Sequence, residues 1–303
     1  MLQLLFFLSI AVYGCGFQSP PSDFPYRMDL ASETFHLPDN LKEISGLSLG
    51  FDDSTLFAVE DETGQLFLID KTSGKTKLEV PFWKDGDYES VERVGDEVFV
   101  GKSNGNLYQI QNPGSEAQTV TKHESPLDKS CDMEGMAYDA KNQRLLLSCK
   151  GDAGIERARA IYAFDLKTMA LDSTPAYVIT WDSVFHFIQA NPDLERWQKL
   201  LEMFDPKEPD LAFAPSALAI HPITGHLYLL SSVGKHMVVL DPTTGDILHI
   251  QKLKKKVHPQ PEGICFDPDG TMYVSNEAKD GTALIHRFVY RVESEAQAVG
   301  KKE

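Results

Sequence analysis

The stretch from Ser45 to Lys75, SGLSLGFDDSTLFAVEDETGQLFLIDKTSGK, contains short apolar runs separated by turns rich in Gly, Asp and Ser. The segment from Ser216 to Asp246, SALAIHPITGHLYLLSSVGKHMVVLDPTTGD, repeats the same order of runs and turns. Runs of about four to seven apolar or alternating residues are typical of β-strands joined by hairpins rather than of helices. Related copies start at Ser45, Glu89, Glu134, Ser216 and Glu262.

The spacing of these copies predicts the architecture. Successive copies begin 44, 45, 82 and 46 residues apart, and a repeat of roughly 40–45 residues with about four strands is the blade of a β-propeller. We therefore expect an all-β protein with a single propeller of five blades, or of six if the long interval hides a degenerate blade. The last copy has only three clear strands, so the segment from Tyr26 to Leu37 is expected to supply its outer strand and close the ring.

The long interval also carries a predicted helical insertion, over about residues 183–205. Asn191 is a suitable N-cap, Pro192 suits the first turn, and Asp205-Pro206 would end the helix. The apolar residues that would share one helix face are Leu194, Trp197, Leu200, Leu201 and Phe204. Such a helix is expected to brace the outside of the ring, with a lid over one mouth of the channel as the alternative.

The N-terminus has the features of a targeting signal. Leu2 to Val12 is almost wholly apolar but too short to span a bilayer, as in the core of a signal peptide. Val12-Tyr13-Gly14-Cys15 then has the form of a bacterial lipobox in which Cys15 receives the lipid, although the usual Lys or Arg before the apolar core is absent. A buried N-terminal strand with an ordinary Cys15 is the alternative.

These features divide the chain into four parts. They are a signal peptide with lipobox (1–15), a tether (16–25), the propeller (26–293) and a polar tail (294–303). The expected location is the bacterial cell envelope, where the protein is held to a membrane by its lipid and faces the periplasm or the exterior. The net charge of -16 argues against a nucleic-acid partner.

Three cysteines remain after Cys15. Cys131 precedes the first strand of its blade and Cys149 ends the second, so a disulfide can form between them in an oxidising compartment. The expected register, however, places Glu134 rather than Cys131 opposite Cys149, which leaves the disulfide open. Cys265 lies inside an apolar strand and is expected in the core.

Polar residues are expected to gather at one mouth of the channel, because the innermost strand of each blade begins there and the second strand returns to it. The candidate metal ligands are Glu89, Glu134, Glu262, Asn276 and Glu60. The candidate ligand-binding residues are Lys102, Lys150, Ser216 and Glu277. Such oxygen atoms are the ligands that calcium requires. In the alternative, the two lysines pair with Glu89 and Glu134, and no metal is needed.

Several of these motifs resemble those of the SdiA-regulated (YjiK-like) propeller proteins. The motifs are Tyr88-Glu89-Ser90-Val91, Cys131-Asp132-Met133-Glu134-Gly135-Met136-Ala137-Tyr138, Gln260-Pro261-Glu262-Gly263-Ile264 and Met272-Tyr273-Val274-Ser275-Asn276-Glu277. The similarity extends from about Tyr26 to Arg291. It implies a small exported or envelope-anchored propeller, with bound calcium as an expectation and with no established reaction.

Two classes of function follow. The first is a non-catalytic, lipid-anchored propeller that binds a protein, a glycan or a small ligand at its acidic mouth. The second is a metal-dependent hydrolase of the gluconolactonase type, for which Glu262 and Asn276 are suitable ligands. The characteristic Pro-Asn-Gly step of that type is missing, and the fourth repeat has Pro215-Ser216-Ala217 instead. The binding protein is therefore the favoured class.

Overall fold

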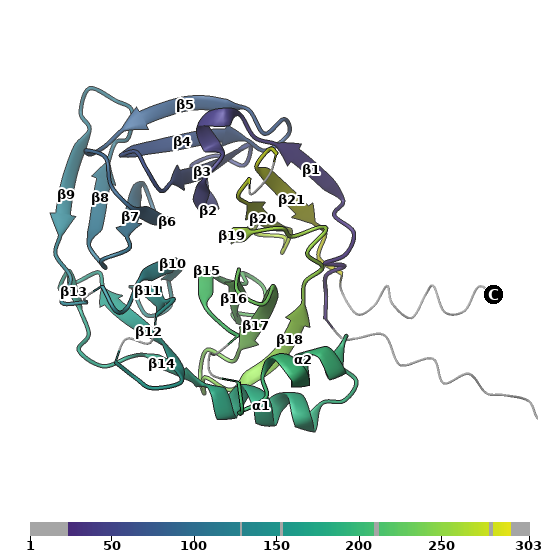
Figure 1. Ribbon diagram of the computed structural model, residues 1–303. Coiled ribbons are helices and arrows are strands. Elements are labelled where there is room, and N and C mark those ends of the chain that lie inside the picture. The colour runs from purple at the N-terminus through teal and green to yellow at the C-terminus, as the bar shows by residue number, and fades with distance from the viewer. Residues whose placement is uncertain (1–23, 128, 152–153, 209–211, 279–280, 292–303) are drawn as a thin grey trace, which may run out of the picture.

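Five antiparallel sheets stand around a central axis in the computed structural model, which describes residues 24–127, 129–151, 154–208, 212–278 and 281–291 (Figure 1). Each sheet is one blade, and the strands nearest the axis begin at Ile44, Tyr88, Met133, Pro215 and Pro261. The predicted propeller of five blades is thus confirmed. The long interval adds no sixth sheet in the described part of the chain, because it holds the outer strands of blade 3 and two helices.

Blades 1 and 2 follow the chain from the innermost strand outward. Blade 1 consists of β2 (Ile44–Leu49), β3 (Thr55–Glu60), β4 (Gln65–Asp70) and β5 (Thr76–Pro81). Blade 2 consists of β6 (Tyr88–Val94), β7 (Glu97–Lys102), β8 (Leu107–Gln111) and β9 (Thr119–His123). A short 3-10 helix, η1 (Asp39–Leu41), precedes blade 1.

Blades 3 and 4 flank the long interval. Blade 3 consists of β10 (Met133–Asp139), β11 (Arg144–Cys149), β12 (Ala158–Asp165), β13 (Ala170–Leu171) and β14 (Tyr177–Thr180), the last two of which both pair with β12. Blade 4 consists of β15 (Pro215–Ile220), β16 (Leu227–Ser231), β17 (His236–Leu240) and β18 (Ile247–Lys252).

Blade 5 is completed by the N-terminal segment. Its strands are β19 (Pro261–Phe266), β20 (Met272–Asn276), β21 (Leu284–Phe288) and β1 (Glu33–His36). β1 pairs antiparallel with β21, with Thr34 opposite His286, and the two strands lie side by side in Figure 1. The expected ring closure by the first described strand is therefore confirmed.

The segment before β1 is anchored by hydrogen bonds of Tyr26 and by the burial of aromatic rings. The Tyr26 hydroxyl donates a hydrogen bond to the carbonyl oxygen of Gly270 (2.6 Å) and accepts one from Nε2 of His221 (2.8 Å). Nδ1 of His221 in turn accepts from the backbone N–H of Thr224, which leaves Nε2 as the donor. Phe24 is also buried, among the apolar side chains of blades 4 and 5.

Apolar side chains fill each of the five junctions between neighbouring blades. At the junction of blades 5 and 1, for example, Leu56 and Phe67 share a cluster with Tyr273 and Cys265. Cys265 is a free, buried cysteine, as predicted. Since every blade is covered on both faces, the ring is stabilised by burial at all five junctions.

The helical insertion contains two helices rather than the one predicted. α1 (Trp181–Ala190) begins at Thr180, whose hydroxyl accepts from the backbone N–H of Ser183. Asn191 ends this helix instead of starting one, and α2 (Trp197–Met203) follows after a turn. The prediction failed because Asn-Pro is as compatible with a helix end as with a helix start, whereas Thr180 is the true N-cap.

The insertion braces the ring, as expected. Trp181, Ile188, Leu200 and Phe204 share one cluster with side chains of blades 3 and 4, and the helices lie on the outside of the ring near β14 and β18 (Figure 1). The Trp181 indole N–H also donates to the carbonyl oxygen of Phe204 (2.9 Å), which ties the two helices together.

Candidate functional site at the acidic mouth

The innermost strand of every blade begins with a β-bulge at the same position. In blade 3, Met133 lies opposite Cys149 and Gly135 opposite Ser148, so no residue of the neighbouring strand β11 lies opposite Glu134. The corresponding unpaired residues are Ser45, Glu89, Ser216 and Glu262. A bulge turns the extra side chain away from the regular pleat. We call the end of the channel where these five bulges lie the acidic mouth.

Small residues follow the bulges because neighbouring inner strands approach closely there. A Cβ on Gly46 would lie 2.7 Å from the backbone nitrogen of Val91, and one on Gly135 would lie 2.8 Å from that of Leu218. Blades 2 and 4 place Ser90 and Ala217 at this level. The recurring acid-glycine step therefore combines a bulged carboxylate with the room that the next blade needs.

Three of the predicted metal ligands lie around one narrow cavity on the axis. Glu89, Glu134 and Glu262 line this cavity, whose volume is about 10 Å³. That is close to the space of one water molecule. Below the carboxylates the cavity is walled by one apolar layer, formed by Leu47, Val91, Met136, Leu218 and Ile264.

One lysine accompanies the three carboxylates. Nζ of Lys150 lies 2.6 Å from Oε1 of Glu134, which confirms this predicted ion pair. Burial, and then repulsion from Glu134, raise the pKa of Glu89 far above its usual range and that of Glu262 to about 8. Burial also raises the pKa of Glu134, although Lys150 opposes the shift. At neutral pH Glu89 and Glu262 therefore hold protons, and Lys150 compensates the charge of Glu134.

The other predicted ligand-binding residues have local partners. Lys102 does not show the expected pair with Glu89 and instead places Nζ 5.5 Å from the centre of the Tyr88 ring. Ser216 Oγ donates to the carbonyl oxygen of Pro261 (2.8 Å). Glu277 accepts from Nε2 of Gln260 (2.8 Å).

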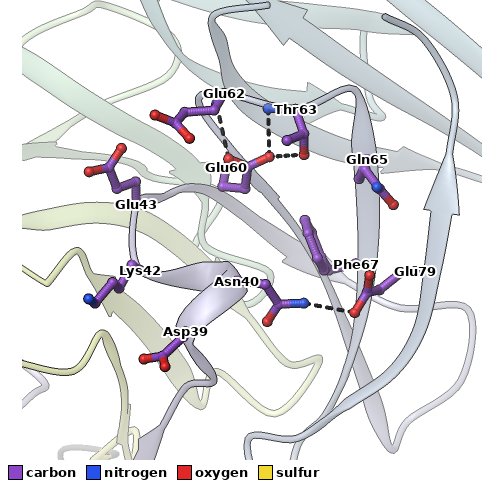
Figure 2. A pocket seen from close by; sticks show the side chains of 10 residues that line it. All are labelled: Asp39, Asn40, Lys42, Glu43, Glu60, Glu62, Thr63, Gln65, Phe67 and Glu79. Carbon is purple, nitrogen blue, oxygen red and sulfur yellow. Dashed lines mark hydrogen bonds between the residues drawn. The ribbon is translucent and has the colours of Figure 1, made fainter. Parts of the chain in front are cut away.

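Asn276 and Glu60 do not line the cavity of the three channel glutamates. Asn276 is fully buried, and neither of its side-chain polar atoms has a hydrogen-bond partner within the described ranges. Glu60 accepts from the backbone N–H groups of Glu62 and Thr63 and so stabilises its own turn. Figure 2 shows Glu60 on the wall of a second pocket, of about 320 Å³, which also contains Asn40 of η1.

The glutamates are not arranged as a finished metal site. Among the described residues, no group of three His, Cys, Asp or Glu side chains could hold a metal ion as it stands. The carboxylates of Glu89, Glu134 and Glu262 are nevertheless hard oxygen donors of the kind that calcium prefers. For the three to share one ion, Glu134 would have to exchange its contact with Lys150 for the ion.

The disulfide that the sequence left undecided is present in the structure. Cys131 and Cys149 are bonded, with a Cα–Cα distance of 4.7 Å. The predicted register was wrong by one residue, because the bulge places Met133 rather than Glu134 opposite Cys149. The bond therefore links the chain before β10 to the end of β11, beside the bulge at Glu134.

Sequence reasoning missed further charged groups near the mouth. Asp87 repels Glu89 and Asp132 repels Glu134, while Lys235 attracts Glu262. Each aspartate stands two positions before its bulged glutamate. This recurring Asp-x-Glu spacing was the signal that could have identified them.

A ring of five blades, closed by its first described strand and carrying bulged carboxylates at one mouth, defines a five-bladed β-propeller. The chain belongs to the SdiA-regulated family, whose sequence model matches residues 24–279. No curated protein matches the chain in sequence. No helix in the described ranges is long and apolar enough to cross a membrane.

Solved structures are similar to this chain at low sequence identity, and the first of those below supports the fold. Glutaminyl cyclase of Myxococcus xanthus is similar with a TM-score of 0.56 and 14% identity, over 87% of this chain and 96% of that chain. The WD40 propeller domain of Doa1 has a TM-score of 0.45 and 7% identity, over 83% of this chain and 80% of that chain. A luciferin-regenerating enzyme has a TM-score of 0.47 and 12% identity, over 81% and 77%. At 14% identity the likeness to the glutaminyl cyclase concerns the fold alone.

Proposed function

We propose that the protein is a non-catalytic binding propeller that takes calcium at its acidic mouth. The observation that carries the proposal is the placement of Glu89, Glu134 and Glu262 around a cavity with room for about one water molecule. Such a space admits a monatomic cation but no organic ligand. Their raised pKa values mean that Glu89 and Glu262 hold protons at neutral pH. A divalent cation is the ligand that would replace these protons, because it lets the three carboxylates lie close together in their charged form.

The cation would connect the mouth to a larger partner. Calcium takes about six to eight oxygen ligands, which is more than three carboxylates supply when each binds through one atom. Oxygen atoms of a protein, a glycan or a small ligand could complete the coordination from the open side of the mouth. We therefore propose that calcium makes this face of the propeller competent to bind such a partner.

We further propose that the propeller works in the bacterial cell envelope, anchored through a lipid on Cys15. The lipobox supports this location, and so does the disulfide between Cys131 and Cys149, because disulfides persist in oxidising compartments. Residues 1–23, with the signal peptide, Cys15 and most of the tether, lie outside the described residues.

Replacing Cys15 with Ser is expected to move the protein from the membrane fraction to the soluble fraction and to abolish labelling with a fatty-acid analogue. Stable anchoring needs more than one acyl chain, and a bacterial lipoprotein normally carries two or more on this cysteine. The matched control is Cys265→Ser, which should leave the protein in the membrane fraction. Unchanged membrane association of the Cys15→Ser protein would contradict the anchor.

Calcium is expected to raise the melting temperature of the protein, and a chelator should lower it again. A ligand that binds only the native state stabilises it by mass action, by about 2.7 kcal/mol when its concentration is about 100 times Kd. For a domain of this size that corresponds to roughly 5 °C or more. Differential scanning calorimetry with and without EDTA measures the shift.

Two variants locate the effect. Glu262→Gln should blunt the response to calcium, because it removes one carboxylate from the cavity on the axis. Glu79→Gln, in the separate pocket of Figure 2, should respond like the wild type. The absence of any shift with calcium, magnesium, manganese or zinc would contradict the cation site. The described residues add no observation in favour of the hydrolase, so we do not propose it.

A further inference from the structure

The channel has a second mouth of different chemistry at the opposite end, where the innermost strands finish. A cavity of about 270 Å³ opens there, and we call it the apolar mouth. At the third position after each bulge its wall carries Ser48, Glu92, Ala137, Ala219 and Cys265. Four of these side chains are small and leave the space of the cavity. The fifth, Glu92 of blade 2, is long.

Larger apolar side chains form the rim of this cavity. The next position along the inner strands places Leu49, Tyr138, Ile220 and Phe266 around it. Blade 2 contributes Arg93 at this level, but its guanidinium donates to the carbonyl oxygen of Gly50. The backbone N–H of Arg93 donates to Ser48 Oγ (3.2 Å). Arg93 is therefore held at the wall by contacts within the protein.

Glu92 is the one carboxylate that lines the apolar mouth among the described residues. Burial raises its pKa to about 8, although Ser48 and Arg93 favour the charged form. At neutral pH its carboxyl group therefore carries a proton and offers one donor and one acceptor to a ligand. Because the apolar layer of Leu47, Val91, Met136, Leu218 and Ile264 separates the two mouths, this group acts independently of the acidic mouth.

We propose that the apolar mouth is a second binding site, which takes a small neutral molecule with an aromatic or branched apolar body and one amide-like polar group that pairs with Glu92. The cavity is slightly smaller than the range of about 300–1,000 Å³ that is typical of ligand pockets, so the ligand is small. Apolar side chains with a few polar groups among them, here Glu92 with Ser48, Arg93 and Tyr138, are the usual composition of such sites. A carboxylic acid and a primary amide can form two hydrogen bonds with each other, which fixes the orientation of the ligand.

Benzamide is a suitable probe, since it combines an aromatic ring with one primary amide. Ligand-observed NMR on the full chain, in EDTA so that calcium plays no part, should show saturable binding of benzamide. Glu92→Leu should weaken it by about tenfold, as expected for lost hydrogen bonds in an apolar site. Glu92→Gln keeps a donor and an acceptor and should retain most of the affinity. Toluene, which lacks the amide, should bind equally to the wild type and Glu92→Leu.

Cys265 supplies a second readout that does not depend on any variant. Its thiol lines the same cavity and is the free cysteine of the described residues. Because Cys265 is buried, its labelling by N-ethylmaleimide should be slow in the free protein, and benzamide should slow it further, as followed by peptide mass spectrometry. Glu89→Gln, at the other mouth, should change neither readout. The proposal is overturned if benzamide shows no saturable binding at about 10 mM, equivalent to roughly 3 kcal/mol of affinity, or if it binds Glu92→Leu as well as the wild type.

Discussion

Removing residues 26–37 is expected to abolish cooperative folding of the propeller. The deleted segment buries Tyr26, Met28, Phe35 and Leu37, and each such side chain contributes about 1.5–3 kcal/mol. The sum is comparable to the whole stability of a typical domain, about 5–15 kcal/mol. The deletion also leaves the outer edge of β21 unpaired, and an exposed strand edge promotes aggregation.

The measurement is thermal unfolding by circular dichroism, together with size-exclusion chromatography. Leu30→Ala is the matched control, because Leu30 lies in the same segment but is 64% exposed, and it should melt like the wild type. A deletion variant that stays monomeric and melts as the wild type does would show that the ring closes without β1.

Gly46→Val is expected to lower the melting temperature by about 6–12 °C, which corresponds to roughly 3 kcal/mol or more for a domain of this size. The added Cβ would come within 2.9 Å of three backbone atoms of Ser90 and Val91 in the next blade. Such a contact cannot be relieved by rotating a side chain, so the two inner strands must separate. The junction of blades 1 and 2 would then lose part of its packing.

Ser90→Gly is the matched control for this variant, since Ser90 occupies the same level in blade 2 and the substitution only removes atoms. Ser90→Gly should lower the free energy of unfolding by about 1 kcal/mol, which is less than the loss expected for Gly46→Val. Equal stability of Gly46→Val and the wild type in chemical denaturation would contradict the close approach of the inner strands.

The ring could be predicted from the sequence because each blade repeats one strand order. The copies at Ser45 and Ser216 carry hairpin turns at matching places, and turn residues depend mainly on local backbone geometry. Ring closure was predictable for a similar reason, since the last copy lacked an outer strand and β1 was the segment left to supply it. Local patterns therefore decided both features.

The missed features depend on contacts between distant segments. α1 was missed because its N-cap, Thr180, is also the last residue of strand β14, so that only packing against blades 3 and 4 distinguishes the helix from a longer strand. The bulges were missed because a strand alignment drawn from the sequence assumes an unbroken ladder. That one-residue error changed the expected register at Cys149.

The candidate site was predictable in part. Glu89, Glu134 and Glu262 hold equivalent places in three copies, and the structure brings them to one cavity. Glu60 and Asn276 end second strands but do not line that cavity, and Glu60 lines the separate pocket of Figure 2. Strand order thus predicts which end of the channel a residue reaches, whereas side-chain direction at that end depends on local packing.

Isothermal titration of calcium into the wild type, Glu262→Gln and Lys150→Met shows whether the acidic mouth binds the ion. We expect one calcium ion per chain for the wild type. We also expect affinity lower by about tenfold for Glu262→Gln, and higher affinity for Lys150→Met, because the ion no longer competes with the lysine for Glu134. No calcium binding to the wild type, or equal affinity in all three proteins, would contradict a cation site at the acidic mouth.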